Sequence, residues 1–318
     1  MNATDWSLVG DIGATYARFG LVQPDGTLTK TRSIPCKDFA TIADALAAYL
    51  GDVDGAEPAQ AVLAVAASPM GDKVSLTNHP WTFSIEELRQ RVGMRRLRVV
   101  NDFYAQAAAV LYLGEDERRQ IGPGAAVTDA PIGVIGPGTG LGVSALVPTA
   151  TGPMPIAGEG GHVTMSPADA RESAVLDLLR RRYDHVSAER VLSGPGLVNL
   201  YNALCELSEV PAASLMAAQI THPRTGATDA CAQEATAMFC AMLGTVAGNL
   251  ALTLGARGGI YIAGGIVPKL DDGFAQSQFR ARFEAKGRFR AYLTAIPTYV
   301  VVHRWVGLLG ASKLLGCP

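Results

Sequence analysis

A carboxylate beside a glycine-bearing turn is the first feature of this chain that could do chemistry. The segment LVGDIGATYARFGLV, residues 8–22, has two apolar runs around that turn, which predicts a β-hairpin. Gly10 and Gly13 permit backbone geometries that other residues resist, so amide groups there can point at a phosphate. Asp11 is then close enough to serve the magnesium ion of a nucleotide. The segment alone fits an ordinary first hairpin of an α/β domain equally well.

A second glycine-rich turn, GPGTGLG at 136–142, lies between two strand-like runs. Its spacing differs from a dinucleotide fingerprint, which needs Gly-x-Gly-x-x-Gly at the start of a helix. The chain also has no Gly-Lys-Ser or Gly-Lys-Thr of a P-loop. The amides of Gly138 and Gly140 and the hydroxyl of Thr139 are therefore candidates to hold a phosphate, with a plain turn as the alternative.

A third glycine element, AGGIV at 263–267, ends an expected strand and starts an expected helix. Gly264 and Gly265 would let the backbone approach a flat ligand such as adenine, or would let helix and strand pack closely. Taken together and in this order, the three glycine elements resemble the motif pattern of the superfamily of sugar kinases, heat-shock ATPases and actin.

Asn101 and Asp102 follow the strand-like run LRVV and precede a helical pattern. A hydroxyl group is a weak nucleophile at neutral pH, and a carboxylate positioned to take its proton accelerates its reaction by about 10²–10⁴-fold. Asp102 is thus a candidate general base. Asn and Asp are also preferred residues at helix N-termini, so capping alone is the alternative.

The loop GEGGH at 158–162 holds a glutamate and a histidine three residues apart. The two glycines between them disfavour the helix that a metal-binding pair of this spacing needs, and no further ligand cluster is visible. Glu159 and His162 can instead hold adjacent hydroxyls of a sugar, one accepting and one donating. Glu189 lies near an expected helix start, where the helix dipole alone favours a glutamate.

Apolar β-rich runs alternate with helical patterns, which is typical of α/β architecture. We expect strands at 7–10, 17–22, 61–66, 97–100, 132–135, 142–146 and 260–263. We expect helices at 39–50, 103–113, 173–182, after 187, at 235–254 and at 306–315. The helix at 235–254 is uncharged and long enough to cross a membrane, but Gly244, Gly248 and its polar residues favour a buried helix with close contacts.

The stretch 114–130 is polar and then rich in Gly, Pro and Ala, which predicts a linker between two domains. We therefore expect a small α/β domain made of residues 1–113 and 303–318, with the last helix packed on it. Residues 114–302 would form a large α/β domain. The two strand pairs around the glycine turns resemble each other loosely, as a duplicated fold would.

The composition points away from nucleic acid and from a membrane as partners. The 318 residues are 48% hydrophobic and 18% charged, with a formal net charge of −2. This balance gives no electrostatic reason to expect nucleic acid or an anionic membrane. Five scattered cysteines without a CxxC pair fit reduced thiols in a cytoplasm. The first residues lack a basic region followed by an apolar stretch, so we expect no signal peptide.

Long strings of this sequence closely resemble the bacterial glucokinase family, the hexokinase-like branch of the superfamily. They run nearly end to end: LVGDIGATYAR, SLTNHPWTFS, VVNDF, GPGTGLGV, GEGGHV, HVSAERVLSGPGLVNLY, GNLAL and YIAGGIVP. The resemblance implies a two-domain actin-like ATPase (ribonuclease H-like) fold, duplicated, with the active site in the interdomain cleft. It further implies transfer of the γ-phosphoryl group of ATP, with Mg²⁺, to the 6-hydroxyl of D-glucose by a cytoplasmic homodimer.

By position, the resemblance makes Asp102 the general base. It assigns the sugar contacts to Asn101, Glu159, His162 and Glu189. For Glu189 this overturns the local interpretation as an ordinary helix-start residue. It assigns ATP binding to Gly10, Asp11, Ile12, Gly13, Ala14 and Thr15, with Asp11 holding the magnesium indirectly, and we add Gly138, Thr139, Gly140, Gly264 and Gly265. Many relatives have glycine where this chain has Ala14, whose methyl group narrows the turn.

The sequence alone leaves other functions open. A kinase for mannose, fructose or an amino sugar would share these motifs, and ADP or polyphosphate could replace ATP as donor. A sugar-responsive regulator would need a DNA-binding or partner module, and a chaperone-like or actin-like ATPase would need extra segments. Repressor-type sugar kinases carry a cysteine-rich zinc motif that this chain lacks.

Overall fold

The computed structural model describes residues 6–53 and 57–316, which divide into two compact units. The first unit contains the residues up to 113, residues 155–157 and those from 303 onward; the second contains 114–154 and 158–302. Cys317 and the first five residues, on which part of the thiol and signal-peptide expectations rests, lie outside the described residues. The cysteines within them, Cys36, Cys205, Cys231 and Cys240, are buried free thiols.

The first unit is built on a five-stranded sheet in the order β3-β2-β1-β4-β7. Its strands are β1 (Ser7–Ile12), β2 (Tyr16–Val22), β3 (Leu28–Pro35), β4 (Gln60–Val65) and β7 (Arg96–Asn101), and a separate hairpin pairs β5 (Lys73–Ser75) with β6 (Thr82–Ser84). β1 is antiparallel to β2 and parallel to β4, and β4 is parallel to β7. The register pairs Ile12 with Val65 and Val65 with Asn101, so the chain leaves β1 and β7 at the same edge of the sheet.

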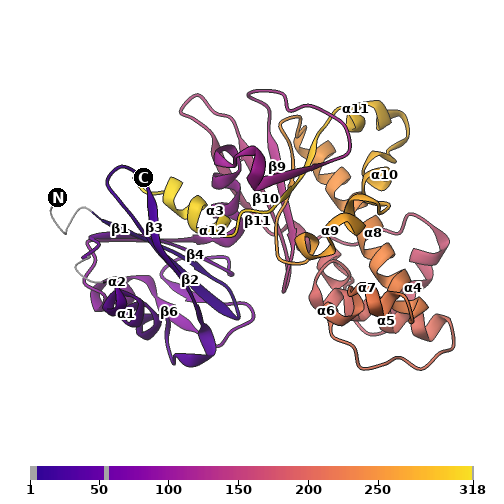
Figure 1. Ribbon diagram of the computed structural model, residues 1–318, viewed down its shortest axis with the longest axis horizontal. Helices are drawn as coiled ribbons and strands as arrows, with labels where there is room; N and C mark the ends of the chain where they lie inside the picture. The colour runs from indigo at the N-terminus through magenta and orange to yellow at the C-terminus, as the bar shows by residue number, and fades with distance from the viewer. Residues whose placement is uncertain (1–5, 54–56, 317–318) are drawn as a thin grey trace. The chain divides into compact units, whose positions relative to one another are not determined.

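Helices cover both faces of this sheet (Figure 1). One apolar cluster includes α1 (Ile42–Asp52) and α2 (Ile85–Arg91), and another includes α3 (Asp102–Ala109) and α12 (Val306–Lys313). The expected helix at 39–50 begins later, at Ile42. Thr41 accepts a hydrogen bond from the Asp44 amide and the Asp44 carboxylate accepts one from the Thr41 amide, and this reciprocal cap sets the start.

The second unit is built on a six-stranded sheet in the order β11-β10-β9-β12-β13-β8. Its strands are β8 (Arg118–Ile121), β9 (Ile132–Pro137), β10 (Leu141–Val147), β11 (Met154–Gly158), β12 (Gly259–Ile262) and β13 (Thr298–Val301). β9 is antiparallel to β10 and parallel to β12, and β12 is parallel to β13. The expectation of a linker throughout 114–130 is wrong, because β8 pairs antiparallel with β13 as the last strand of this sheet.

The helices of the second unit surround one long apolar helix, α8 (Ala230–Leu254). The others are α4 (Ala170–Arg180), α5 (Gly194–Leu207), α6 (Ala217–Ile220), α7 (Pro223–Gly226), α9 (Asp271–Ala275), α10 (Phe279–Glu284) and α11 (Arg290–Thr294). By length and composition α8 could cross a membrane, yet most of it is buried. Methyl groups on Gly244 or Gly248 would collide with the α10 backbone, so the expected buried helix with small residues at a close contact is confirmed.

The last helix, α12, packs on the first unit, as the sequence predicts. Gly307 and Gly310 lie on its packed side. A methyl group at 307 would come within 2.6 Å of the Asp11 carboxyl carbon, and one at 310 would overlap the backbone carbonyl of Ala105 in α3. These glycines permit close packing because they lack a side chain, and the helix covers the carboxylate of Asp11 as a result.

We predict that Gly310→Ala lowers the free energy of unfolding by about 1–3 kcal/mol, because backbone cannot easily yield to an added methyl group. Gly51→Ala is the matched control, since Gly51 lies in α1 of the same unit and its methyl group would meet open space. That control should raise the free energy of unfolding by about 0.5–1 kcal/mol through helix propensity. Urea unfolding of both variants decides the matter, and equal effects would contradict the packing argument.

Candidate active site

The first glycine turn joins β1 to β2. The Gly13 amide donates to the Tyr16 carbonyl (3.0 Å), and the Cys36 amide donates to the Thr15 carbonyl (2.9 Å). The expectation that Gly10 and Gly13 need unusual backbone geometry is wrong, because neither has a positive φ. Gly10 is required for space instead: a methyl group there would come within 2.6 Å of the Leu63 side chain. Ala14 also has no positive φ, so its methyl group brings no backbone strain.

Asp11 is half-buried and faces Arg18, its partner across the hairpin. The Arg18 guanidinium donates to Asp11 Oδ2 at 3.1 Å. Burial raises the pKa of Asp11, and the Arg18 charge and hydrogen bond oppose that rise. Sequence reasoning missed Arg18, although pairing seven residues apart across a short hairpin was the signal that could have found it.

A magnesium ion at this turn would have one carboxylate, that of Asp11, beside it. Among the described residues, no group of three or more His, Cys, Asp or Glu side chains is placed to hold a metal. Magnesium commonly uses one or two carboxylates together with substrate phosphates and water. The single carboxylate of Asp11 fits an ion that arrives with a nucleotide.

Asn101 and Asp102 lie where β7 passes into α3. The Asn101 Oδ1 accepts from the amides of Phe103 (2.9 Å) and Tyr104 (3.1 Å), and its Nδ2 donates to the Ala67 carbonyl (3.1 Å). Capping by Asn101 is therefore confirmed. Asp102 is the first helical residue and is half-buried, and its Oδ1 accepts from the Phe103 amide at 2.9 Å. The cap fixes the backbone that carries Asp102.

The second glycine turn joins β9 to β10 and is held from two sides. The Gly138 amide donates to the Gly140 carbonyl, and the Gly194 amide at the start of α5 donates to the Gly138 carbonyl, both at 2.8 Å. Thr139 is exposed at the tip. A methyl group on Gly138 would meet open space, whereas one on Gly140 would overlap the Glu189 carboxylate. The two glycines of one turn therefore have different reasons to be glycine.

Gly264 follows β12 and lies against the end of β9. Its φ is +80°, and a methyl group would overlap the Pro137 carbonyl, so glycine is required there twice over. Gly265 is exposed and has open space beside it. Because β9 and β12 are parallel neighbours, the second glycine turn and these two glycines lie at the same edge of the second sheet.

Glu159, His162 and Glu189 lie on two segments that meet. The His162 Nε2 is 4.0 Å from Glu159 Oε2, and both side chains are exposed. The Met165 amide donates to the Val186 carbonyl (3.0 Å), and the Ala188 amide donates to the Val163 carbonyl (2.9 Å), so the two segments run side by side. The structure thus brings the three predicted sugar residues of the second unit into one region.

Glu189 lies in the first turn of a helix, as its local interpretation expects, but this helix is a single 3₁₀ turn, Ala188–Arg190, and α5 begins only at Gly194. Its Oε2 accepts a hydrogen bond from the Leu141 amide at 2.8 Å. Sequence reasoning missed Leu141, because its backbone amide carries no signal in the sequence.

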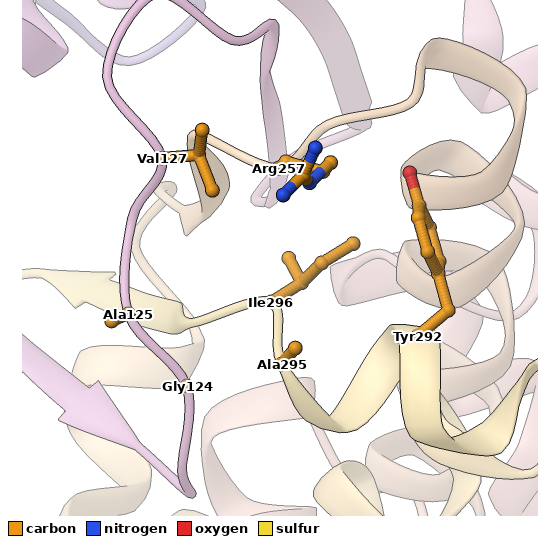
Figure 2. A pocket seen from close by; sticks show the side chains of 7 residues that line it. All are labelled: Gly124, Ala125, Val127, Arg257, Tyr292, Ala295 and Ile296. Carbon is orange, nitrogen blue, oxygen red and sulfur yellow. The ribbon is translucent and has the colours of Figure 1, made fainter.

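A cavity of about 680 Å³ lies elsewhere in the second unit. Figure 2 shows Arg257, Tyr292 and Ile296 around it, with Val127 on the loop beside Arg257. None of the predicted site residues lines this cavity.

Comparison with known proteins decides the family. A family model described as Glucokinase matches residues 8–316. A glucokinase of Paramagnetospirillum magneticum is 49% identical over 313 residues, covering 98% of each chain. This chain belongs to the glucokinase family. A second glucokinase, of Aromatoleum aromaticum, is 49% identical over 97% of this chain and 94% of its own. The crystal structure of a glucokinase from an Antarctic psychrotroph superposes with a TM-score of 0.86 at 36% identity, covering 98% of each chain.

The raised pKa of Asp11 predicts how pH affects the stability of this glucokinase family member. Between the ordinary aspartate pKa of about 3.9 and the raised value, the folded state binds more protons, so the free energy of unfolding falls as pH rises. The Asp11→Asn variant cannot bind this proton, so its free energy of unfolding lacks this pH dependence. In urea unfolding at a series of pH values, the variant should therefore gain stability relative to the parent as pH rises above about 4.

Asp25 provides a control of opposite sign. The backbone amide of Thr27 donates to Asp25 Oδ1 at 2.8 Å and holds the pKa of this exposed aspartate below its ordinary value. The free energy of unfolding of Asp25→Asn, minus that of the parent, should therefore fall as pH rises through the range just below about 3.9. If the Asp11→Asn difference also falls with pH, the Arg18 charge outweighs burial and the assignment of cause is wrong.

Proposed function

We propose that this protein is an ATP-dependent glucokinase that transfers the γ-phosphoryl group of ATP to the 6-hydroxyl of D-glucose, giving glucose 6-phosphate and ADP. The observation that carries the proposal is the 49% identity to a glucokinase across 98% of both chains. The arrangement of carboxylates and glycine turns within each unit supports it. We further propose that the enzyme works in the cytoplasm as a homodimer on these small-molecule substrates.

We also propose that the fold is the duplicated, ribonuclease H-like fold of actin-like ATPases. Each sheet contains an antiparallel hairpin around a glycine turn, followed outward by two parallel strands: β2-β1-β4-β7 in one unit and β10-β9-β12-β13 in the other. The same order of strands in both units supports descent from a single repeated element.

In the proposed mechanism Asp102 takes the proton from the sugar hydroxyl while that oxygen attacks the γ-phosphorus. Phosphoryl transfer asks a protein mainly for alignment and for neutralisation of charge. Asn101, through its three hydrogen bonds to Ala67, Phe103 and Tyr104, holds the backbone of Asp102 in place. Asn101, Glu159, His162 and Glu189 fix the sugar through its other hydroxyls. Water must be excluded because it competes with the sugar as an acceptor.

The nucleotide is assigned to the glycine elements. The turns at 13–15 and 138–140 would hold the phosphates through the amides of Ala14, Thr15, Thr139 and Gly140, because the Gly13 and Gly138 amides already donate within their own turns. Gly265, with open space beside it, would face the base. Magnesium, when bound, offsets the phosphate charge, and Asp11 would hold it indirectly. Asp11 must be ionised for this role, and Arg18 favours that form.

The direct test is ADP formation by the purified protein with glucose and Mg-ATP, compared with the same mixture lacking sugar. We expect release that depends on sugar and is greatest with glucose in a panel that includes mannose, fructose and glucosamine. A different best hexose would overturn the substrate assignment. Sugar binding without turnover would instead indicate a sugar-responsive regulator, and ADP release independent of sugar would indicate an ATPase of another class.

Asp102→Asn should lower kcat by about 10²–10⁴-fold, because the amide cannot accept the hydroxyl proton, while glucose binding is largely retained. Glu86→Gln is the matched control, since Glu86 also lies in the first turn of a helix in the first unit. Its kcat should equal that of the parent. Steady-state kinetics with calorimetric glucose titration separates the two effects, and near-normal turnover in Asp102→Asn would remove it as the base.

A further inference from the structure

We propose that the backbone of Leu141 positions the sugar-binding side chains of the second unit, with Glu189 on its amide side and the Glu159–His162 loop on its carbonyl side. Gly140 and Gly161 are then positioning residues for glucose. This inference rests on the proposed function and extends it. It also gives Gly140, which the sequence pointed to as a phosphate ligand, a role toward the sugar.

The first contact is on the amide side of Leu141. Its N–H donates to Glu189 Oε2 at 2.8 Å, and a hydrogen bond to a charged carboxylate is stronger than one between neutral groups. The carboxylate occupies the space where a side chain at 140 would begin. Glu189 can hold this position only because residue 140 is glycine. The other oxygen, Oε1, has no hydrogen-bond partner within the described part of the chain and is the one to accept from a sugar hydroxyl.

The second contact is on the carbonyl side of Leu141. A methyl group on Gly161 would overlap the Leu141 carbonyl, and one on Gly160 would come within 2.8 Å of the Val143 side chain. The loop that carries Glu159 and His162 therefore lies directly on β10. The distance from this loop to Glu189 is set by the width of one strand backbone.

Leu141 can position these side chains because its own backbone cannot move easily. It is 4% exposed and pairs with Pro137 across the β9–β10 hairpin. Close-packed interiors transmit displacement rather than absorb it, so a methyl group at 140 or 161 must move the sugar ligands instead of the strand. Neither glycine has a positive φ, so backbone conformation does not explain them.

Neighbouring glycines serve as comparisons. A methyl group on Gly138, in the same turn as Gly140, would meet open space. One on Gly158, three residues before Gly161, would make only an ordinary contact at 3.7 Å with the Val143 carbonyl. Each pair therefore separates displacement of a sugar ligand from a general effect of alanine in that segment.

The experiment measures KM for glucose and KM for ATP separately in Gly140→Ala, Gly161→Ala, Gly138→Ala and Gly158→Ala. Misplacement by about 1 Å can cost on the order of 10²-fold, so we expect KM for glucose to rise about 10–100-fold in Gly140→Ala and Gly161→Ala. KM for ATP should change far less in both. Gly158→Ala is the unaffected control and should keep the parent's KM for glucose. Gly138→Ala lies in the proposed phosphate turn and is the converse case, in which any change should fall on KM for ATP and not on KM for glucose.

A double variant keeps the proposal testable if Gly140→Ala folds poorly. Adding Glu189→Asp shortens the carboxylate side chain by one methylene and relieves the overlap, so the double variant should recover the melting temperature without recovering KM for glucose. A glucose KM in Gly140→Ala equal to the parent's, or a rise confined to ATP, would overturn the proposal. So would a double variant no more stable than a poorly folded Gly140→Ala. A parent that forms no sugar-dependent ADP would instead refute the proposed function.

Discussion

Parallel pairing beside an antiparallel hairpin is the constraint on which both units depend. A parallel ladder aligns the carboxyl ends of its strands, so Ile12, Val65 and Asn101 lie in one row at an edge of the first sheet. The chain leaves the sheet at that row, and the first glycine turn and Asp102 therefore share an edge. The pairing of β9 with β12 does the same for the second glycine turn and Gly264. Open α/β sheets place their ligand sites at such edges.

Most glycines around these edges are required because a neighbouring group occupies the space of a side chain, and not because their backbone conformation needs glycine. Gly10, Gly140 and Gly307 have no positive φ, and each borders a side chain that a methyl group would displace. The neighbours are Leu63, Glu189 and Asp11 respectively. Interiors packed to crystal density leave no room for such a group. Gly264 alone among the predicted site glycines also needs its left-handed conformation.

Local patterns predicted most elements and failed at particular places. The strands around both glycine turns and the helices α8 and α12 lie within a few residues of their expected bounds, because apolar periodicity there is strong. The start of α1 depends on the Thr41 and Asp44 side chains, which periodicity does not register. Local pattern does not predict β8, because a four-residue edge strand gains its stability from β13, 177 residues away at the Ile121–Thr298 pair.

The sequence by itself determined the α/β class, the three glycine elements and the family resemblance, since all are carried by local periodicity or by contiguous strings of residues. It left Glu189 looking like an ordinary helix-start residue and was silent on Arg18 beside Asp11. Only the tertiary structure decided these, because the Leu141 amide and the Glu189 carboxylate are 48 residues apart and their contact depends on how β10 and the 3₁₀ turn pack. A hydrogen bond between distant segments, and the space a glycine leaves for it, follow from the assembled fold and have no local pattern.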